Sequence, residues 1–152
     1  MVQRILIVLG LWALVVGQSY ADDAAKKELA KLKGTWTLVK MEIEGKSLLD
    51  KEKPWPKLVI KDGKAAFDAK GAPKGEAVQL AKVLDLSKKP KTVTVPYEGN
   101  ITFYGIYEVE GDELRVCGDG VDTANEKNPE ARRPKKFDSK EGLLLVFKRE
   151  KK

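Results

Sequence analysis

Apolar and polar side chains alternate through much of the chain after residue 34, with the two-residue spacing that β-strands produce. The dipeptides Asp62-Gly63 and Gly111-Asp112 each separate two such segments by a two-residue loop, which predicts β-hairpins. Leu58 then faces Phe67 in the first hairpin. The predicted strands lie at residues 35–43, 58–60, 65–67, 76–86, 92–95, 101–109, 113–117 and 143–149.

Strands in this hairpin order favour an all-β fold, an eight-stranded antiparallel up-and-down barrel, because closure removes exposed sheet edges. An open sandwich of two sheets is the structural alternative. A barrel of eight strands is filled by its own side chains or holds one small ligand. The side chains expected inside are Trp36, Val59, Phe67, Val83, Val93, Phe103, Tyr107, Leu114 and Val116.

The N-terminal segment has the features of a secretory signal peptide. Arg4 precedes an uninterrupted apolar run at residues 5–17, and Ser19-Tyr20-Ala21 places small residues where a signal peptidase reads. A retained membrane anchor is the alternative, but a span needs about 20 apolar residues. We therefore expect a leader at residues 1–21, cleavage after Ala21, and export to the periplasm or the medium.

Residues 22–152 then form one domain. Residues 22–33 predict a short helix, since acidic residues open the segment, lysines dominate its end, and Gly34 follows. Residues 71–75 (GAPKG) predict a turn. The polar, turn-rich segment at residues 118–142 is long enough to be functional or to carry a short helix of its own.

The amino-acid composition excludes several kinds of catalytic and metal-binding site. The 152 residues include no His and one Cys, which excludes His-based catalytic triads, His metal ligands and an intramolecular disulfide. We expect Cys117 to be a buried, inert thiol, although an intermolecular disulfide after export stays open. The formal net charge of +6 comes mainly from dispersed lysines, so we expect a solubilising surface and no nucleic-acid partner.

Five segments carry a resemblance to a known family. They are Gly34-Thr35-Trp36, residues 84–91 (LDLSKKPK), residues 105–117 (GIYEVEGDELRVC), Arg133-Pro134 with Phe137, and residues 147–150 (FKRE). Together they resemble an exported lipocalin-like (calycin-type) domain family that is expanded in planctomycete bacteria, over about residues 29–151. The resemblance implies a lipocalin-like barrel plugged at its closed end by Trp36, with Arg149 packed across the indole. It implies no particular activity.

Candidate ligand-binding residues lie among the aromatic side chains. Trp55 lies in the connection after the first strand, which covers the open mouth in lipocalin-like barrels, and Phe67, Phe103 and Tyr107 could line a pocket beneath it. Core packing is the competing interpretation. A second candidate is the basic cluster of Arg132, Arg133, Lys135 and Lys136, which could meet an anionic envelope surface.

Other candidate sites are weaker. The acidic loop at residues 119–130 lacks the spacing of a calcium loop, and Asp85 with Glu108 shows no defined acid–base separation. We therefore expect a monomeric, non-catalytic binding protein for a small, partly apolar molecule at the barrel mouth, with no metal or cofactor. The alternative is a cell-envelope structural or protein-interaction module with a filled barrel core.

Overall fold

The computed structural model describes residues 23–50, 52–53, 55–68 and 77–151. The chain divides into two units, Met1–Lys31 and Leu32–Lys152. The predicted N-terminal helix is present at residues 23–32. No helix in the described ranges is long and apolar enough to cross a membrane. The leader predicted at residues 1–21 and the turn predicted at residues 71–75 lie outside the described residues.

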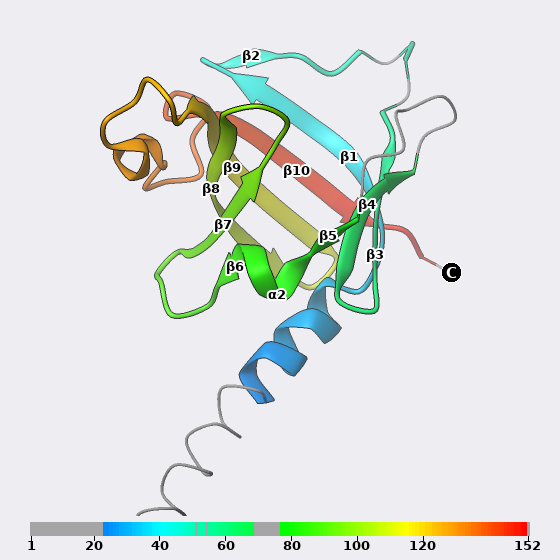
Figure 1. Ribbon diagram of the computed structural model, residues 1–152. Helices are drawn as coiled ribbons and strands as arrows, with labels where there is room; N and C mark the ends of the chain where they lie inside the picture. The colour runs from blue at the N-terminus through cyan, green and yellow to red at the C-terminus, as the bar shows by residue number, and fades with distance from the viewer. Residues whose placement is uncertain (1–22, 51, 54, 69–76, 152) are drawn as a thin grey trace, which may run out of the picture. The chain divides into compact units, whose positions relative to one another are not determined.

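The second unit is mostly antiparallel β-structure. Its elements are β1 (Gly34–Ile43), β2 (Lys46–Ser47), β3 (Lys57–Lys61), β4 (Lys64–Asp68), β5 (Val78–Gln79), α2 (Leu80–Val83), β6 (Leu84–Asp85), β7 (Lys91–Pro96), β8 (Ile101–Glu110), β9 (Glu113–Asp122), the 3₁₀-helix η1 (Pro129–Arg132) and β10 (Leu143–Arg149). Nine strands form one sheet in the order β5-β4-β3-β1-β10-β9-β8-β7-β6, and β2 pairs with β1 outside this path. The sheet curls into a half barrel, in which β3 and β4 face β7 and β8 across the central strands (Figure 1).

Both predicted hairpins are present in the predicted register. Leu58 pairs with Phe67 across the β3–β4 turn, where Asp62 and Gly63 adopt φ values of 52° and 73°. Positive φ at both central residues is what a type I′ turn requires. Val109 pairs with Leu114 in the β8–β9 hairpin. The last strand, β10, also has its predicted bounds.

The continuous strand predicted at residues 76–86 is wrong. Two short strands, β5 and β6, flank the single helical turn α2, and they form the two edges of the sheet. The sequence of α2, Leu-Ala-Lys-Val, begins with three good helix formers, and the buried Leu80 anchors it. The Leu80 amide donates to the carbonyl of Gly63 at 2.9 Å. The eight-stranded closed barrel is therefore replaced by a half barrel whose edges are joined through α2.

The strand predicted at residues 113–117 is longer than expected, because β9 continues to Asp122. Glycines at 118 and 120 favoured a turn in the sequence, but both continue the pairing with β8. The ring of Phe103 lies where a Cβ on Gly105 would be placed, 2.6 Å from its Cε1, and it also occupies the corresponding space above Gly118. These two glycines therefore give a large ring room to lie flat against the sheet.

The register assigns the buried side chains to two faces. The concave face carries Trp36, Tyr107, Leu114 and Phe147, all with exposed fractions of 4% or less. The predicted interior residues Phe67, Val93, Phe103 and Val116 share this face by register.

Three interior assignments are wrong. Phe67 shares the concave face by register, but it is 56% exposed because β4 lies next to the short edge strand β5. Val59 pairs with Thr35 and Ala66, so it points to the side opposite Leu58. Val83 belongs to α2 and to no strand.

The convex face has a core of its own. Ile106, Cys117 and Leu144 form a buried cluster, and Phe137 from the segment at residues 123–142 packs against it. This segment lies outside the curl of the sheet and contains η1, as the sequence allowed (Figure 1). Because β10 contributes Leu144 to this face and Phe147 to the other, both of its faces are covered, which explains its nearly continuous hydrophobic sequence.

Candidate functional site

One end of the concave face is closed by Trp36. This side chain is fully buried, and its indole Nε1 donates to the carbonyl oxygen of Leu32 at 2.8 Å. The guanidinium carbon of Arg149 lies 4.4 Å from the centroid of the indole ring, so the contact implied by the resemblance is present. Arg149 also donates to the carbonyl of Lys33, and its Nε lies 3.2 Å from an Asp112 carboxylate oxygen. The arginine thereby connects the start of β1 with the β8–β9 turn.

The side chains next to this pair are equally well packed. Ile60, Tyr107, Leu114 and Phe147 are between 2% and 4% exposed. Tyr107, one of the predicted ligand-lining residues, therefore belongs to the packed end of the concave face and presents no free surface to a ligand.

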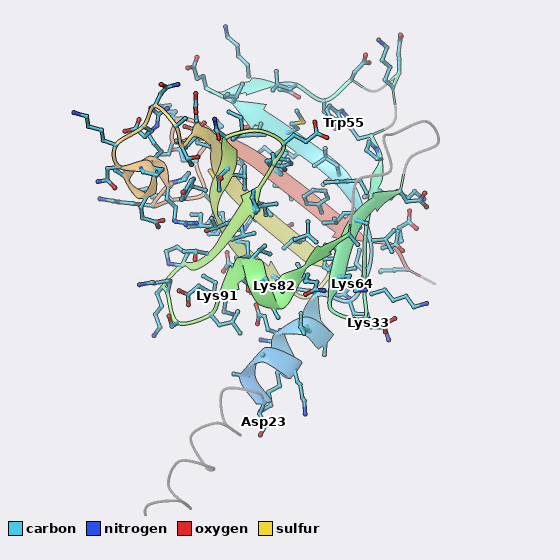
Figure 2. The ribbon with its side chains drawn as sticks, in the orientation of Figure 1. Asp23, Lys33, Trp55, Lys64, Lys82 and Lys91 are labelled. Atoms are coloured by element: carbon cyan, nitrogen blue, oxygen red, sulfur yellow. The ribbon has the colours of Figure 1, made fainter. Side chains whose placement is uncertain are left out.

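Several apolar side chains on or near the concave side of the sheet are exposed or half-buried. Phe67 on β4 is 56% exposed, and Trp55, just before β3, is 44% exposed. Figure 2 shows Trp55 at the end of β3 away from the β3–β4 turn. Met41, Val95 and Leu145 are only half-buried. We call these five residues the open end.

Phe103 also lies on the concave face by register. Its ring is half-buried and lies against Gly105 and Gly118. Of the four predicted ligand-lining residues, the structure thus leaves Trp55 and Phe67 exposed, half-buries Phe103, and buries Tyr107 at the packed end.

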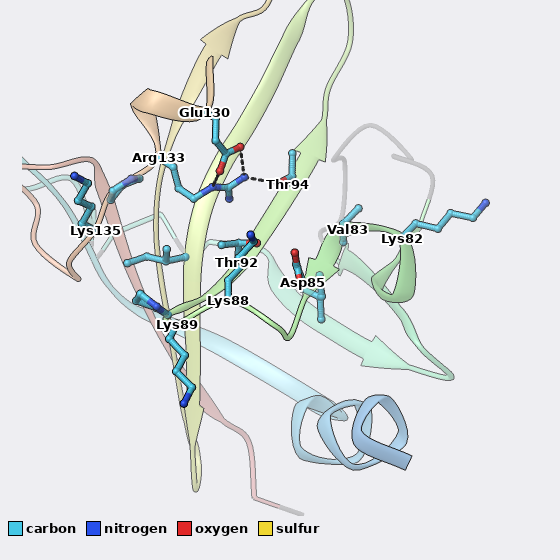
Figure 3. Close-up of a pocket in the computed structure, with 14 residues that line it drawn as sticks. Lys82, Val83, Asp85, Lys88, Lys89, Thr92, Thr94, Glu130, Arg133 and Lys135 are labelled. Carbon is cyan, nitrogen blue, oxygen red and sulfur yellow. Dashed lines mark hydrogen bonds and ion pairs between the residues drawn. The ribbon is translucent and has the colours of Figure 1, made fainter. Parts of the chain in front are cut away.

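The structure also contains a cleft that sequence reasoning missed. It lies on the convex side, between α2, the turn before β7 and the segment following η1, and its volume is about 810 Å³ (Figure 3). We call it the outer cleft. Its charged lining residues are Lys82, Asp85, Lys88, Lys89, Glu130, Arg133 and Lys135. Two chain segments about 40 residues apart supply these charges, so no local sequence motif indicates the site.

Arg133 holds the segment after η1 against the sheet. Its side chain is 10% exposed, and its guanidinium donates to the carbonyls of Val93 and Gly105, at 3.0 and 2.5 Å, and to Thr94 Oγ1 at 2.7 Å. It also lies 5.3 Å above the Tyr104 ring. Arg133 is thus engaged within the fold.

The rest of the predicted basic cluster divides into paired and exposed residues. Arg132 donates to an Asp119 carboxylate oxygen at 2.9 Å. The side chains of Lys135 and Lys136 are exposed, and Lys135 lines the outer cleft. The four residues therefore do not form one uniform basic surface.

Hydrogen bonds favour the ionised form of the two carboxylates in the outer cleft. Hydrogen bonds from the Ser87 hydroxyl, at 2.6 Å, and the Ser87 amide, at 3.0 Å, lower the pKa of Asp85. The hydrogen bond from Arg133 lowers the pKa of Glu130. A depressed pKa makes each a poor proton donor at neutral pH. Glu108 forms an ion pair with Arg115, away from the outer cleft.

Cys117 is fully buried, as expected, and burial raises the pKa of its thiol. The thiol lies 3.5 Å from the Asp138 carbonyl oxygen. A protonated, inaccessible thiol is a poor nucleophile. Within the part of the chain that the structure describes, no three His, Cys, Asp or Glu side chains are placed to hold a metal ion.

Comparisons of the chain with protein-family models, with curated proteins and with solved structures give no match.

Proposed function

We propose that this chain is an exported, non-catalytic, lipocalin-like binding protein that takes up a small, partly apolar molecule at the open end. The observation that carries this proposal is the contrast in burial along one face of one sheet. Trp36 is fully buried, whereas Phe67, two strands away in the same register row, is 56% exposed.

The contrast has a physical consequence for binding. Exposed apolar surface gains roughly 25 cal/mol for each Å² that is removed from water. A concave surface with aromatic side chains on its rim covers a small molecule on several sides, so more of the molecule's apolar surface is removed from water. The packed end, with Arg149 across Trp36, gives the open end a rigid base.

The tight packing around Trp36 and the exposed side chains of the open end together favour binding over a purely structural role. A module with a filled core would bury its concave apolar side chains at both ends, as this chain does around Phe147. Trp55, just before β3, and Phe67 on β4 are left accessible instead.

A neutral fluorescent probe tests the proposal. N-phenyl-naphthylamine is apolar and uncharged at neutral pH, and its emission rises when water is excluded. We expect saturable binding to the chain of residues 22–152, with affinity reduced about tenfold in Phe67→Ser and in Trp55→Ser, because each removes apolar contact area. Val59→Ser is the matched control, since Val59 lies on the same hairpin and points to the opposite face.

Two results would contradict the proposal. One is the absence of saturable binding by the parent chain, which would favour the structural or interaction module. The other is an equal loss of affinity in the Val59→Ser control, which would indicate a general effect on the fold.

Export is part of the same proposal, and it depends on the sequence of residues 1–21. Expression of the full chain in a bacterium should yield a processed protein whose first residue is Asp22. N-terminal sequencing of the envelope and medium fractions checks this. An intact Met1 in the folded protein would contradict cleavage.

A further inference from the structure

The outer cleft lies on the opposite side of the sheet from the open end. Thr92, Thr94 and Ile106 line it, and the register places all three on the convex face. Any molecule in this cleft is therefore separated by the sheet from a ligand of the concave face. The volume of about 810 Å³ falls within the range of small-molecule sites.

The charge of the outer cleft is strongly asymmetric. Glu130 and Arg133 are joined by hydrogen bonds of 2.5 and 3.0 Å, so their charges offset each other. Four lysines then face a single remaining carboxylate, that of Asp85. These lysines are Lys82, Lys88, Lys89 and Lys135. Within the described ranges, none of the four has a carboxylate within ion-pair distance.

Lys88 holds the central place among these lysines. Figure 3 shows it beside Thr92 and Asp85, whereas Lys82 and Lys89 extend outward at the margins. Its positive charge contributes to lowering the pKa of both Asp85 and Glu130, which agrees with a position between the two acidic groups.

The walls of the outer cleft add apolar surface and hydroxyl groups. The apolar lining consists of Val83, Leu84, Pro90, Ile106 and Pro134. Thr94 accepts a hydrogen bond from Arg133 through Oγ1, so its hydroxyl hydrogen remains to donate. The lining therefore combines an apolar floor, hydroxyl donors and a cationic margin.

We propose that the outer cleft is a second binding site, for a small organic anion with an apolar body and a phosphate, sulfate, sulfonate or carboxylate group. The apolar body lies against Ile106 and the neighbouring aliphatic side chains, and the acidic group lies at Lys88. The marginal lysines raise the local concentration of anions through their field. Asp85 and Glu130 lie in the same hollow as the lysines. Their negative charges repel a polyanion or an anionic membrane, which would present many closely spaced negative charges to the cleft.

A pair of matched probes distinguishes this site from the open end. Anilinonaphthalene sulfonate carries the same aromatic system as N-phenyl-naphthylamine, with a sulfonate added. We expect Lys88→Gln combined with Lys135→Gln to weaken binding of the sulfonate probe about fivefold or more, since two favourable charge contacts are lost. Binding of the neutral probe should remain unchanged, so this test is independent of the proposed function.

The matched control removes the same charge elsewhere. Lys46 on β2 and Lys148 on β10 are exposed, and neither lines the outer cleft. Lys46→Gln with Lys148→Gln should leave the affinity for the sulfonate probe within about twofold of the parent, because distant exposed charges are screened. Far-ultraviolet circular dichroism establishes that both double variants fold.

Two outcomes would overturn the proposal. The first is an equal loss in both double variants, or in neither, which would show that the overall charge or the open end binds the probe. The second comes from phosphatidylglycerol vesicles. Binding to vesicles that depends on Lys88 and Lys135, without binding of the soluble sulfonate, would assign these lysines to a membrane contact.

Discussion

The Phe103 ring leaves no room for a side chain at two neighbouring backbone positions. Its side chain lies across two paired glycines, Gly105 on β8 and Gly118 on β9, and fills the space that their Cβ atoms would take. The sequence placed Gly105 within a predicted strand but Gly118 at the start of a turn-rich segment, because turn formation is a common reason for a glycine. Their actual role is close approach of an aromatic ring to the backbone.

Gly118→Ala should therefore destabilise the chain by about 1–3 kcal/mol, the usual range for overpacking a filled site. Gly120→Ala is the matched control on the same strand and face. The nearest atom to its added Cβ is Ile101 Cγ2 at an ordinary 3.6 Å. Urea denaturation of both variants measures the difference. In a Phe103→Leu background the Gly118→Ala cost should shrink, and an unchanged cost would refute the role of the ring.

Trp36 and Arg149 make a second prediction about single side chains. Trp36→Ala removes a fully buried indole and its hydrogen bond to Leu32, and should cost about 3–5 kcal/mol. Arg149→Gln removes the cation from the ring face, and its cation–π share is about 0.5–2 kcal/mol. Trp55→Ala is the control, since Trp55 is 44% exposed. Thermal unfolding curves that are alike for Trp36→Ala and Trp55→Ala would contradict the plug.

The segment at residues 123–142 acts as an element of the fold in spite of its polar sequence. Phe137 covers the convex cluster, and Arg115 lies 4.9 Å above the Phe137 ring. The Ser139 carbonyl accepts from the Glu44 amide at 2.7 Å, which connects the segment to the turn after β1. A long loop that makes these contacts is fixed by specific partners along its length.

The neighbouring arginines 132 and 133 should differ sharply in their effect on stability. Arg133→Met leaves two sheet carbonyls and Thr94 without their donor, and we expect a loss of about 2–4 kcal/mol. Arg132→Met removes only exposed ion pairs, with Asp119 at 2.9 Å and Glu126 at 4.0 Å, and we expect a loss of about 1 kcal/mol or less. Urea denaturation at neutral pH compares the two. Equal losses would show that Arg133 does not hold this segment in place.

The sequence predicted those elements whose signals are local. The β3–β4 and β8–β9 hairpins follow from a two-residue alternation around a two-residue turn, and both were found in register. The alternation also misled, since residues 80–83 fit a strand as well as a helical turn and only their contacts decide. The outer cleft was unpredictable for a related reason. Lys88 and Lys135 come together through the packing of a loop on a sheet, which no spacing in the chain encodes.

The sheet as a whole has a strong centre and weak edges. The long strands β1, β9 and β10 lie in the middle, while β5 and β6 have two residues each and form the edges on either side of α2. Amide hydrogens in the central strands should exchange only through global unfolding, because their bonds are enclosed on both sides. Amides in β5, α2 and β6 should exchange through local opening, at a free energy lower by about 2 kcal/mol or more.

Hydrogen–deuterium exchange across a denaturant series separates these two modes, since only global unfolding depends steeply on denaturant. Within this experiment β3 and β4 serve as an internal reference for short strands that are not at a sheet edge, because each has five residues and is paired on both sides. If the amides around α2 proved as protected as those of β10, the edges would be joined as firmly as a closed barrel, and the half barrel would be the wrong description. Local opening there would instead let α2 move away from the sheet edges while the packed end around Trp36 stays intact.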